Sequence, residues 1–199
     1  VSEAELIRIA IKSMGLDELT PFKPEERIIE YMLANAQANK LVNMRLNDFA
    51  NETASESPAP GGGSIAAYVG ALGISLGTMV ANLSSHKKGW DERWKEFGDQ
   101  AEKGQQYKDQ LLKLVDADTA AFNKIMEAFA LPKGTEAEKA TRTQAIQDAT
   151  KYAIEVPFKV METACASMDV IKSMAQTGNP NSVSDAGVGA LCARTAVIG

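Results

Sequence analysis

The segment from Ser57 to Ser85 contains no aspartate, glutamate, lysine or arginine, and it limits the possible folds of this chain more than any other feature. Prolines and glycines rule out regular structure from Ser57 to Ser64, and a helix is expected to follow. Residues 61–85 are longer than the roughly 20 residues that a membrane span needs. The helical part is rich in Gly, Ala, Ser and Thr rather than Leu and Phe, which favours burial in a soluble core or a dimer interface. We therefore expect a buried helix and no membrane span.

The composition favours a helical protein. Hydrophobic residues make up 45% of the 199 residues, charged residues 24% and aromatic residues only 6%, and there are 8 methionines. This balance is typical of helices that pack closely through small side chains, and the length suits one domain with an appendage. The predicted fold class is all-α, a bundle of long, partly kinked helices around the buried Gly/Ala-rich helix.

Start and stop signals divide the chain into predicted helices separated by Pro- and Gly-containing turns. Thr135 and Glu138 have the spacing of a capping box, Pro157 predicts a kink, and Ser182 or Ser184 is expected to cap the last helix. We interpret residues 1–40 as a linker-like helical segment and residues 41–199 as the main domain. The helices are expected at residues 2–15, 25–38, 45–53, 65–85, 91–130, 135–176 and 182–198.

Charge and cysteine content narrow the possible partners. The formal net charge is -5, and no long Lys/Arg run occurs, which argues against binding nucleic acid or an anionic membrane surface. Cys165 and Cys192 lack the spacing of a metal site, so we expect two reduced core thiols in a cytoplasmic protein. A first residue other than Met and an end directly after an apolar run indicate a piece of a longer protein.

Asp118 is the strongest candidate for catalysis. It follows Leu114 by four residues and precedes Phe122 by four, so it lies within an apolar helical stripe that also includes Leu111, Val115, Ile125 and Phe129. A carboxylate on a core face must be paired or hydrogen-bonded, or it serves as a general acid or base. From the residues alone, a helix-packing aspartate remains the alternative.

Two sets of glycines have different interpretations. Gly61, Gly62, Gly63 and Ser64 precede a helix, where unpaired backbone N–H groups favour an anion or an electron-rich group, or where glycines merely allow close passage of the loop. The loop lacks the spacing of nucleotide-binding motifs. Gly70, Gly73 and Gly77 within the helix are better explained by close helix packing.

Other polar residues carry weaker signals. Lys87 and Lys88 could bind a carboxylate tail or simply complement the dipole at a helix end. Asp185 belongs to a segment that could be no more than a turn and a cap. His86, the only histidine, has no partners at the spacing of a catalytic triad or a metal site, so we assign it no catalytic role.

Several short blocks of the sequence, taken together, form a specific pattern. The blocks are residues 57–67, Gly70-Ala71-Leu72-Gly73, Met79-Val80, Lys87-Lys88, residues 114–118, Ala121-Phe122, Leu131-Pro132-Lys133, Val156-Pro157, Gly178-Asn179 and Ser184-Asp185. Over residues 45–199 these blocks resemble the formiminotetrahydrofolate cyclodeaminase family and occur in the family's order. The first forty residues resemble the segment that joins the formiminotransferase and cyclodeaminase parts in bifunctional members.

The resemblance implies an all-helical, dimer-forming domain that closes 5-formimino-tetrahydrofolate to 5,10-methenyl-tetrahydrofolate and releases ammonia, late in histidine degradation. It implies that Asp118 is the catalytic proton donor and that no cofactor is needed beyond the folate substrate. We further expect Gly61 to Ser64 to approach the folate, Lys87 and Lys88 to meet its glutamate carboxylates, and Asp185 to line the site. The substrate is expected to be polyglutamylated.

Two alternatives remain at this stage. A methenyltetrahydrofolate cyclohydrolase shares the family's pattern and hydrolyses the methenyl bridge instead of forming it. A non-catalytic helical dimerisation module is the alternative from another functional class. The linker-like first forty residues favour the deaminase.

Overall fold

The computed structural model describes residues 3–16, 18, 22–29 and 40–199, and its chain separates into two compact units, residues 1–45 and 46–199. The first unit contains α1 (Glu3–Ser13), the short α2 (Pro24–Arg27) and a 3₁₀ turn, η1 (Leu41–Asn43). The predicted helix over residues 25–38 begins within one residue of α2 but is interrupted, because α2 ends at Arg27 and Ile28 is extended. Residues 30–38 of that prediction, and the proposed capping residue Ser2, lie outside the described residues.

The second unit is a helical bundle, preceded by α4 (Leu46–Thr53). Its helices are α5 (Gly62–Ser85), α6 (Trp94–Ala130), α7 (Glu136–Thr177) and α8 (Val183–Ile198), with 3₁₀ turns η2 (Asp91–Arg93) and η3 (Pro180–Ser182) before α6 and α8. Within the described residues no strand occurs, which confirms the all-α prediction. The predicted boundary after residue 40 and the division after residue 45 fall within the same short stretch.

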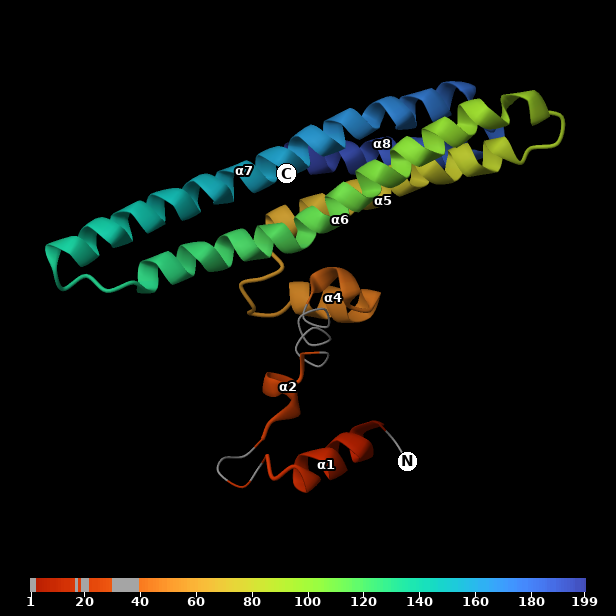
Figure 1. Cartoon of the computed structure of the whole chain (residues 1–199). Helices are drawn as coiled ribbons and strands as arrows, with labels where there is room; N and C mark the ends of the chain where they lie inside the picture. The colour runs from red at the N-terminus through yellow and green to blue at the C-terminus, as the bar shows by residue number, and fades with distance from the viewer. Residues whose placement is uncertain (1–2, 17, 19–21, 30–39) are drawn as a thin grey trace. The chain divides into compact units, whose positions relative to one another are not determined.

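α5 is the central helix and packs against α6, α7 and α8 (Figure 1). Its glycines allow this: a Cβ on Gly70 would lie 3.0 Å from the Cβ of Ala196, and one on Gly73 would lie 2.8 Å from the carbonyl oxygen of Gly189. A Cβ on Gly77 would meet Ile171 at 3.0 Å. The prediction that these glycines serve helix packing is therefore confirmed.

α5 is long and apolar enough to cross a membrane by length and composition, as the sequence indicated. In the structure, 61% of its most apolar window is buried among the other helices. A buried helix of a protein core meets the same criterion of length and composition. Exposed apolar side chains, Leu72, Met79 and Leu83, remain on one side of it.

α6 and α7 form an antiparallel hairpin that is longer than the bundle. Figure 1 shows both helices continuing well beyond the start of α5. The turn between them is fixed by the predicted capping box, in which Thr135 accepts from the Glu138 amide and Glu138 accepts from the Thr135 amide. α7 runs through Pro157 as one helix. The four-helix bundle thus narrows to two helices near the middle of α6.

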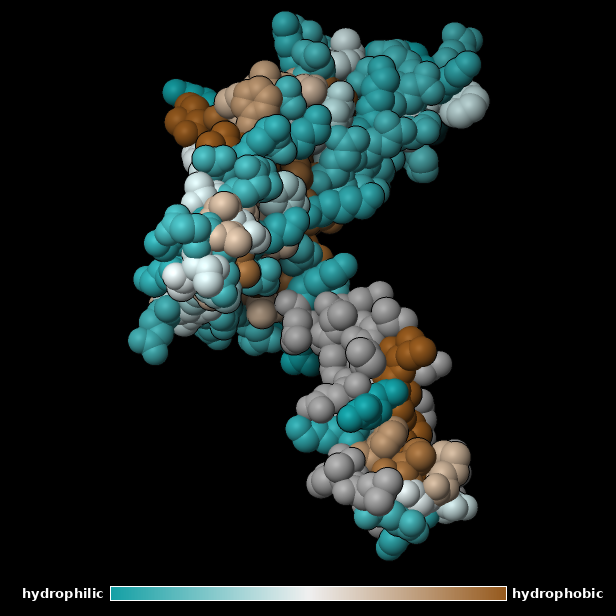
Figure 2. Space-filling model, turned by 60° about the vertical axis from the view of Figure 1, so that its left-hand side comes forward, coloured by the Kyte–Doolittle hydropathy of each residue, from teal (hydrophilic) through white to brown (hydrophobic). Residues whose placement is uncertain are grey.

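The extended hairpin explains a wrong expectation about the apolar stripe. Leu111 and Val115 are fully buried, whereas Phe122 and Phe129 are 40% and 52% exposed. Leu111 and Val115 lie on the part of α6 that α5 covers, whereas Phe122 and Phe129 lie beyond the start of α5. The surface of the unit is largely hydrophilic in the view of Figure 2, with hydrophobic side chains gathered in separate patches.

Candidate functional site

Asp118 lies where the bundle narrows, opposite the first turn of α5. Its Oδ2 atom accepts a hydrogen bond from the backbone N–H of Ser64 at 2.8 Å and one from the Ser64 hydroxyl at 2.9 Å. The N-cap residue of α5 is Gly61, which has no side chain to accept from the first-turn N–H groups. A carboxylate from α6, 54 positions away in the sequence, therefore caps α5.

The glycine loop provides room for this carboxylate. A Cβ on Gly63 would overlap Oδ1 of Asp118, and one on Gly61 would lie 4.0 Å from Oδ2. Glycine is thus required at position 63 by a side chain of another helix. Helix α5 starts at Gly62, so the expectation of a loop through Ser64 is wrong: Gly62, Gly63 and Ser64 form the first helical turn.

A pocket of about 260 Å³ opens beside Asp118. Gly61, Gly62 and Gly63 form one wall, and α6 and α7 supply apolar side chains to another. The structure therefore brings the predicted glycines and Asp118 together around one cavity. Its lining residues are Pro58, Ala59, Gly61, Gly62, Gly63, Asp118, Thr119, Ala121, Phe122, Ile125 and Ala153.

Ser64 does not line this pocket. Its side chain is fully buried, and its hydroxyl lies 3.0 Å from the carbonyl oxygen of Val115 and 3.4 Å from the hydroxyl of Thr119. A fully buried hydroxyl with three protein oxygens around it does not reach a ligand. The geometry opposes a direct substrate contact by Ser64 and places this residue behind Asp118.

Lys87, Lys88 and Asp185 lie at the opposite end of the bundle. α5 has 24 residues, about 36 Å at 1.5 Å per residue, and both lysines follow its last residue. α8 runs antiparallel to α5, so that Asp185 in its first turn is remote from Asp118. Lys87 lies over the ring of Trp90 at 4.1 Å. Within one chain, these three residues do not share a pocket with Asp118.

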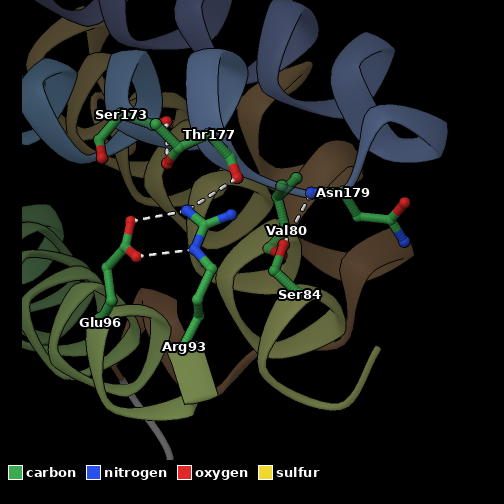
Figure 3. A network of polar contacts seen from close by, with 7 residues as sticks. All are labelled: Val80, Ser84, Arg93, Glu96, Ser173, Thr177 and Asn179. Atoms are coloured by element: carbon green, nitrogen blue, oxygen red, sulfur yellow. Dashed lines mark hydrogen bonds and ion pairs between the residues drawn. The ribbon is translucent and has the colours of Figure 1, made fainter. Parts of the chain in front are cut away.

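That opposite end is closed by polar contacts between α5, α6 and α7 (Figure 3). The Ser84 hydroxyl donates to the Val80 carbonyl at 2.6 Å and accepts from the Asn179 N–H at 2.8 Å. Arg93 donates twice to Glu96, both at 2.9 Å, and once to the Thr177 carbonyl at 3.4 Å. These hydrogen bonds hold the pKa of Glu96 below its ordinary value and raise the pKa of Arg93.

The remaining polar predictions have mixed outcomes. His86 is exposed, and its Nδ1 lies 2.8 Å from the hydroxyl of Ser85. Both cysteines are free thiols as expected, but Cys165 is exposed and Cys192 half-buried, so the expectation of core residues is wrong. Ser182 occupies the predicted N-cap position of α8, but its side chain makes no capping hydrogen bond; the Asn179 side chain caps the preceding 3₁₀ turn. In the described part of the chain, no His/Cys/Asp/Glu group could hold a metal ion.

Sequence reasoning missed the contribution of α7 to the site. Ala153 lines the pocket, yet an alanine within a 42-residue helix carries no signal of its own. Phe122 and Ile125 were recognisable only as members of an apolar stripe. Their position one and two turns after Asp118 could have indicated a pocket wall.

Comparisons with known proteins identify relatives of the whole chain. Formimidoyltransferase-cyclodeaminase of Rattus norvegicus is 36% identical over 200 residues, which cover all of this chain and 37% of that protein. Methenyltetrahydrofolate cyclohydrolase of Methylorubrum extorquens is 38% identical over 151 residues, 76% of this chain and 73% of that protein. The chain thus spans little more than a third of the rat protein.

A solved structure and two family models agree with these relatives. The crystal structure of formiminotetrahydrofolate cyclodeaminase from Thermotoga maritima has a TM-score of 0.65 and 29% identity, and the match covers 78% of this chain and 77% of that one. Residues 1–34 match the model of the formiminotransferase domain. Residues 45–199, which include Asp118, the glycine loop and all four helices of the bundle, match the model of formiminotransferase-cyclodeaminase. The chain belongs to the formiminotransferase-cyclodeaminase family.

Proposed function

We propose that this chain closes 5-formimino-tetrahydrofolate to 5,10-methenyl-tetrahydrofolate and releases ammonia. The observation that carries the proposal is the position of the Asp118 carboxylate, which lies against Gly63 and lines a pocket together with the glycines. The similarity to the Thermotoga maritima formiminotetrahydrofolate cyclodeaminase supports it. Residues 1–34 support a parent protein with a formiminotransferase domain, and we propose that residues 1–40 join the two parts.

The chemistry requires one group that both accepts and donates a proton. The formimino group, an amidine, reacts in its protonated form, C=NH2+. The N10 nitrogen of the folate attacks its carbon, so that a C–N bond forms while the C=N double bond becomes a single bond to an NH2 group, and the N10 proton passes to the Asp118 carboxylate. The resulting carboxylic acid then protonates the amino group of the tetrahedral adduct, and the C–N bond to that group breaks as ammonia leaves. General acid–base catalysis of this kind contributes about 10²- to 10⁴-fold.

The pocket walls would hold the N10 nitrogen of the folate close to the formimino carbon. Because the attack is intramolecular, the protein mainly has to hold a reactive conformer away from water. Phe122, Ile125 and Ala153 offer apolar surface for a ring system, while Gly61 to Gly63 allow close approach to Asp118. At about 260 Å³ the pocket is below the usual 300–1,000 Å³ of ligand sites, so it would enclose only the reacting part of a folate.

No step in this scheme needs a metal or a redox group, so we propose no cofactor beyond the folate itself. Proton transfer by one carboxyl group and an intramolecular attack account for the reaction. The two free thiols, one of them exposed, suit a reducing compartment, and we propose a cytoplasmic location.

We propose a homodimer, because Lys87, Lys88 and Asp185 do not share a pocket with Asp118 within one chain and would need a second chain to contact the same folate molecule. An isologous, antiparallel pair of α5 helices would place the end of one α5 beside the start of the other. The exposed Leu72, Met79 and Leu83 lie along α5 between these ends. Lys87 and Lys88 of the partner subunit would then meet the glutamate tail, and a polyglutamylated tail would gain most.

Mixing two impaired variants tests this arrangement: one lacks the Asp118 carboxylate, and the other lacks the proposed tail contact. Asp118→Asn protein and Lys87→Ala/Lys88→Ala protein, unfolded and refolded together, should form dimers in which one site has both functions intact. We expect the mixture to regain activity toward polyglutamylated substrate at low concentration, and light scattering to report a dimer. A monomer, or a mixture no more active than its components, would contradict the arrangement.

A second candidate, methenyltetrahydrofolate cyclohydrolase, is favoured by the relative from Methylorubrum extorquens. Two incubations separate the candidates. With 5-formimino-tetrahydrofolate, a cyclodeaminase produces ammonia and the methenyl chromophore in equal amounts. With 5,10-methenyl-tetrahydrofolate, a cyclohydrolase bleaches the chromophore and produces no ammonia. If both this chain and its intact parent protein catalyse neither reaction, the result would favour a non-catalytic dimerisation module.

A further inference from the structure

Ser64 holds Asp118 through two separate donors. The backbone N–H and the hydroxyl of Ser64 both donate to Oδ2, at 2.8 Å and 2.9 Å. Hydrogen bonds to an ionised carboxylate are about twice as strong as those between neutral groups. Two donors on one oxygen fix both the position of the carboxyl group and its rotation about the Cβ–Cγ bond.

The two oxygens of Asp118 consequently have different surroundings. Oδ2 faces the first turn of α5 and is held by Ser64. Oδ1 lies against Gly63, where a side chain would overlap it, and Gly63 lines the pocket. Because Oδ1 accepts neither of these hydrogen bonds and lies beside a glycine that lines the pocket, we take it as the oxygen that exchanges a proton with a molecule in the pocket.

The Ser64 hydroxyl has a choice of acceptors. It has one proton, and the carbonyl oxygen of Val115 lies 3.0 Å from it, almost as close as Oδ2 of Asp118. When Asp118 is ionised, the better acceptor is the charged Oδ2. When a proton is on Oδ1, Oδ2 becomes a neutral carbonyl oxygen, and rotation about one C–O bond turns the hydroxyl to Val115.

We propose that Ser64 is a positioning residue that acts through Asp118, keeping Oδ2 fixed and leaving Oδ1 as the oxygen that transfers protons. Its hydroxyl accommodates both protonation states of the carboxyl group without movement of any heavy atom. This inference rests on the proposed function, because it concerns the same proton transfers. It replaces the expectation that Ser64 contacts the substrate.

A purely structural serine would share some of these features, and the chain offers a matched control. Ser84 is on the same helix, is also fully buried, and also makes two hydrogen bonds through its hydroxyl. It lies at the opposite end of α5 from Asp118. Ser64→Ala and Ser84→Ala therefore delete the same group from the same helix, but only the first touches the carboxylate.

The test compares kcat and KM of both variants in the ammonia assay, with thermal unfolding to confirm folding. Loss of one hydrogen bond to a charged group corresponds to about a tenfold to hundredfold fall in kcat for Ser64→Ala, with KM little changed. Ser84→Ala should keep the wild-type kcat while its unfolding temperature falls. Equal kcat values for the two variants, or a Ser64→Ala effect confined to KM, would overturn the proposal.

A double-mutant cycle with Asp118→Asn, measured under single-turnover conditions, separates the inference from the proposed function. If Ser64 acts only through the carboxylate, Ser64→Ala should not slow the Asp118→Asn variant further. The same fold loss in both backgrounds would overturn the positioning role and leave the proposed function standing. Full activity of Asp118→Asn itself would overturn both.

Discussion

The two ends of helix α5 make similar buried hydrogen bonds in different surroundings. At each end a fully buried serine joins α5 to a distant part of the chain, Ser64 to Asp118 on α6 and Ser84 to Asn179 after α7. At the first end the partner is a carboxylate beside a pocket, and at the second it is a backbone N–H inside a closed contact. The two hydrogen bonds are alike, but only the Asp118 end has a pocket in which the proposed chemistry could take place.

The local fold explains this difference. α6 and α7 continue past the first end of α5, so the bundle narrows there and leaves a cavity lined by Gly63 and Asp118. At the other end, Arg93, Glu96 and Thr177 close the contact between α6 and α7. The first end is therefore expected to govern activity, and the second to govern stability.

After replacement of Asp118 itself, the largest expected effect is that of Gly63→Ala on activity. The new Cβ would overlap Oδ1 of Asp118, so the carboxylate must move, and misplacement by about 1 Å can cost about 10²-fold in rate. The ammonia assay measures this loss. Gly98→Ala on α6, where a Cβ would meet nothing within 4 Å, is the control and should retain full activity. Wild-type activity of Gly63→Ala would break the distinction between the two ends.

The same substitution at the other end should act on stability. A Cβ on Gly178 would lie 2.8 Å from Cγ1 of Val80, and overpacking of this kind costs about 1–3 kcal/mol. We expect Gly178→Ala to lower the free energy of unfolding in urea while kcat stays at the wild-type value. A variant with unchanged stability but reduced kcat would show that this end serves catalysis after all.

Lys88→Ala tests whether the second end has any part in binding. We expect KM to rise more for polyglutamylated than for monoglutamyl substrate, with kcat unchanged, because only the tail would reach this lysine. An equal rise in KM for both substrates would contradict the proposed contact between Lys88 and the glutamate tail. Lys133→Ala, which removes a lysine at the hairpin turn, serves as the control for the loss of one positive charge.

The smallest expected effect concerns Glu96, whose pKa is lowered by hydrogen bonds from Arg93. A lowered pKa in the folded state means that this pair stabilises the fold above the ordinary pKa of glutamate. The contribution is lost as the pH falls through the lowered value. Glu96→Gln should therefore reduce the unfolding temperature slightly at neutral pH and not at strongly acidic pH.

Most of the bundle could be predicted from the sequence because its signals are local. The capping box at Thr135 and Glu138 and the packing glycines of α5 act through neighbours along the chain or through one helix face. The start of α5 could not be predicted in this way. Gly62 to Ser64 are helical because a carboxylate from α6 supplies the cap, and nothing near them in the sequence announces it.

The candidate site likewise has residues that the sequence indicates and properties that only the assembled bundle determines. Asp118 stood out because a charge interrupts an apolar stripe, and the glycine triplet because it precedes a helix. The burial of Ser64 and the separation of Lys87 and Lys88 from Asp118 depend on helix lengths and on antiparallel packing, which only the assembled bundle fixes. Exposure of Phe122 likewise follows from where α5 begins, and not from the stripe itself.

The central claim, that the Asp118 carboxylate transfers the protons of the cyclisation, is tested most directly by one assay of Asp118→Asn. Ammonia and the methenyl chromophore are followed together from 5-formimino-tetrahydrofolate, with wild-type protein alongside. An amide cannot accept and return the proton, so both products should appear about 10²- to 10⁴-fold more slowly and remain equal in amount. Ammonia release at the wild-type rate by a correctly folded Asp118→Asn protein would contradict the claim.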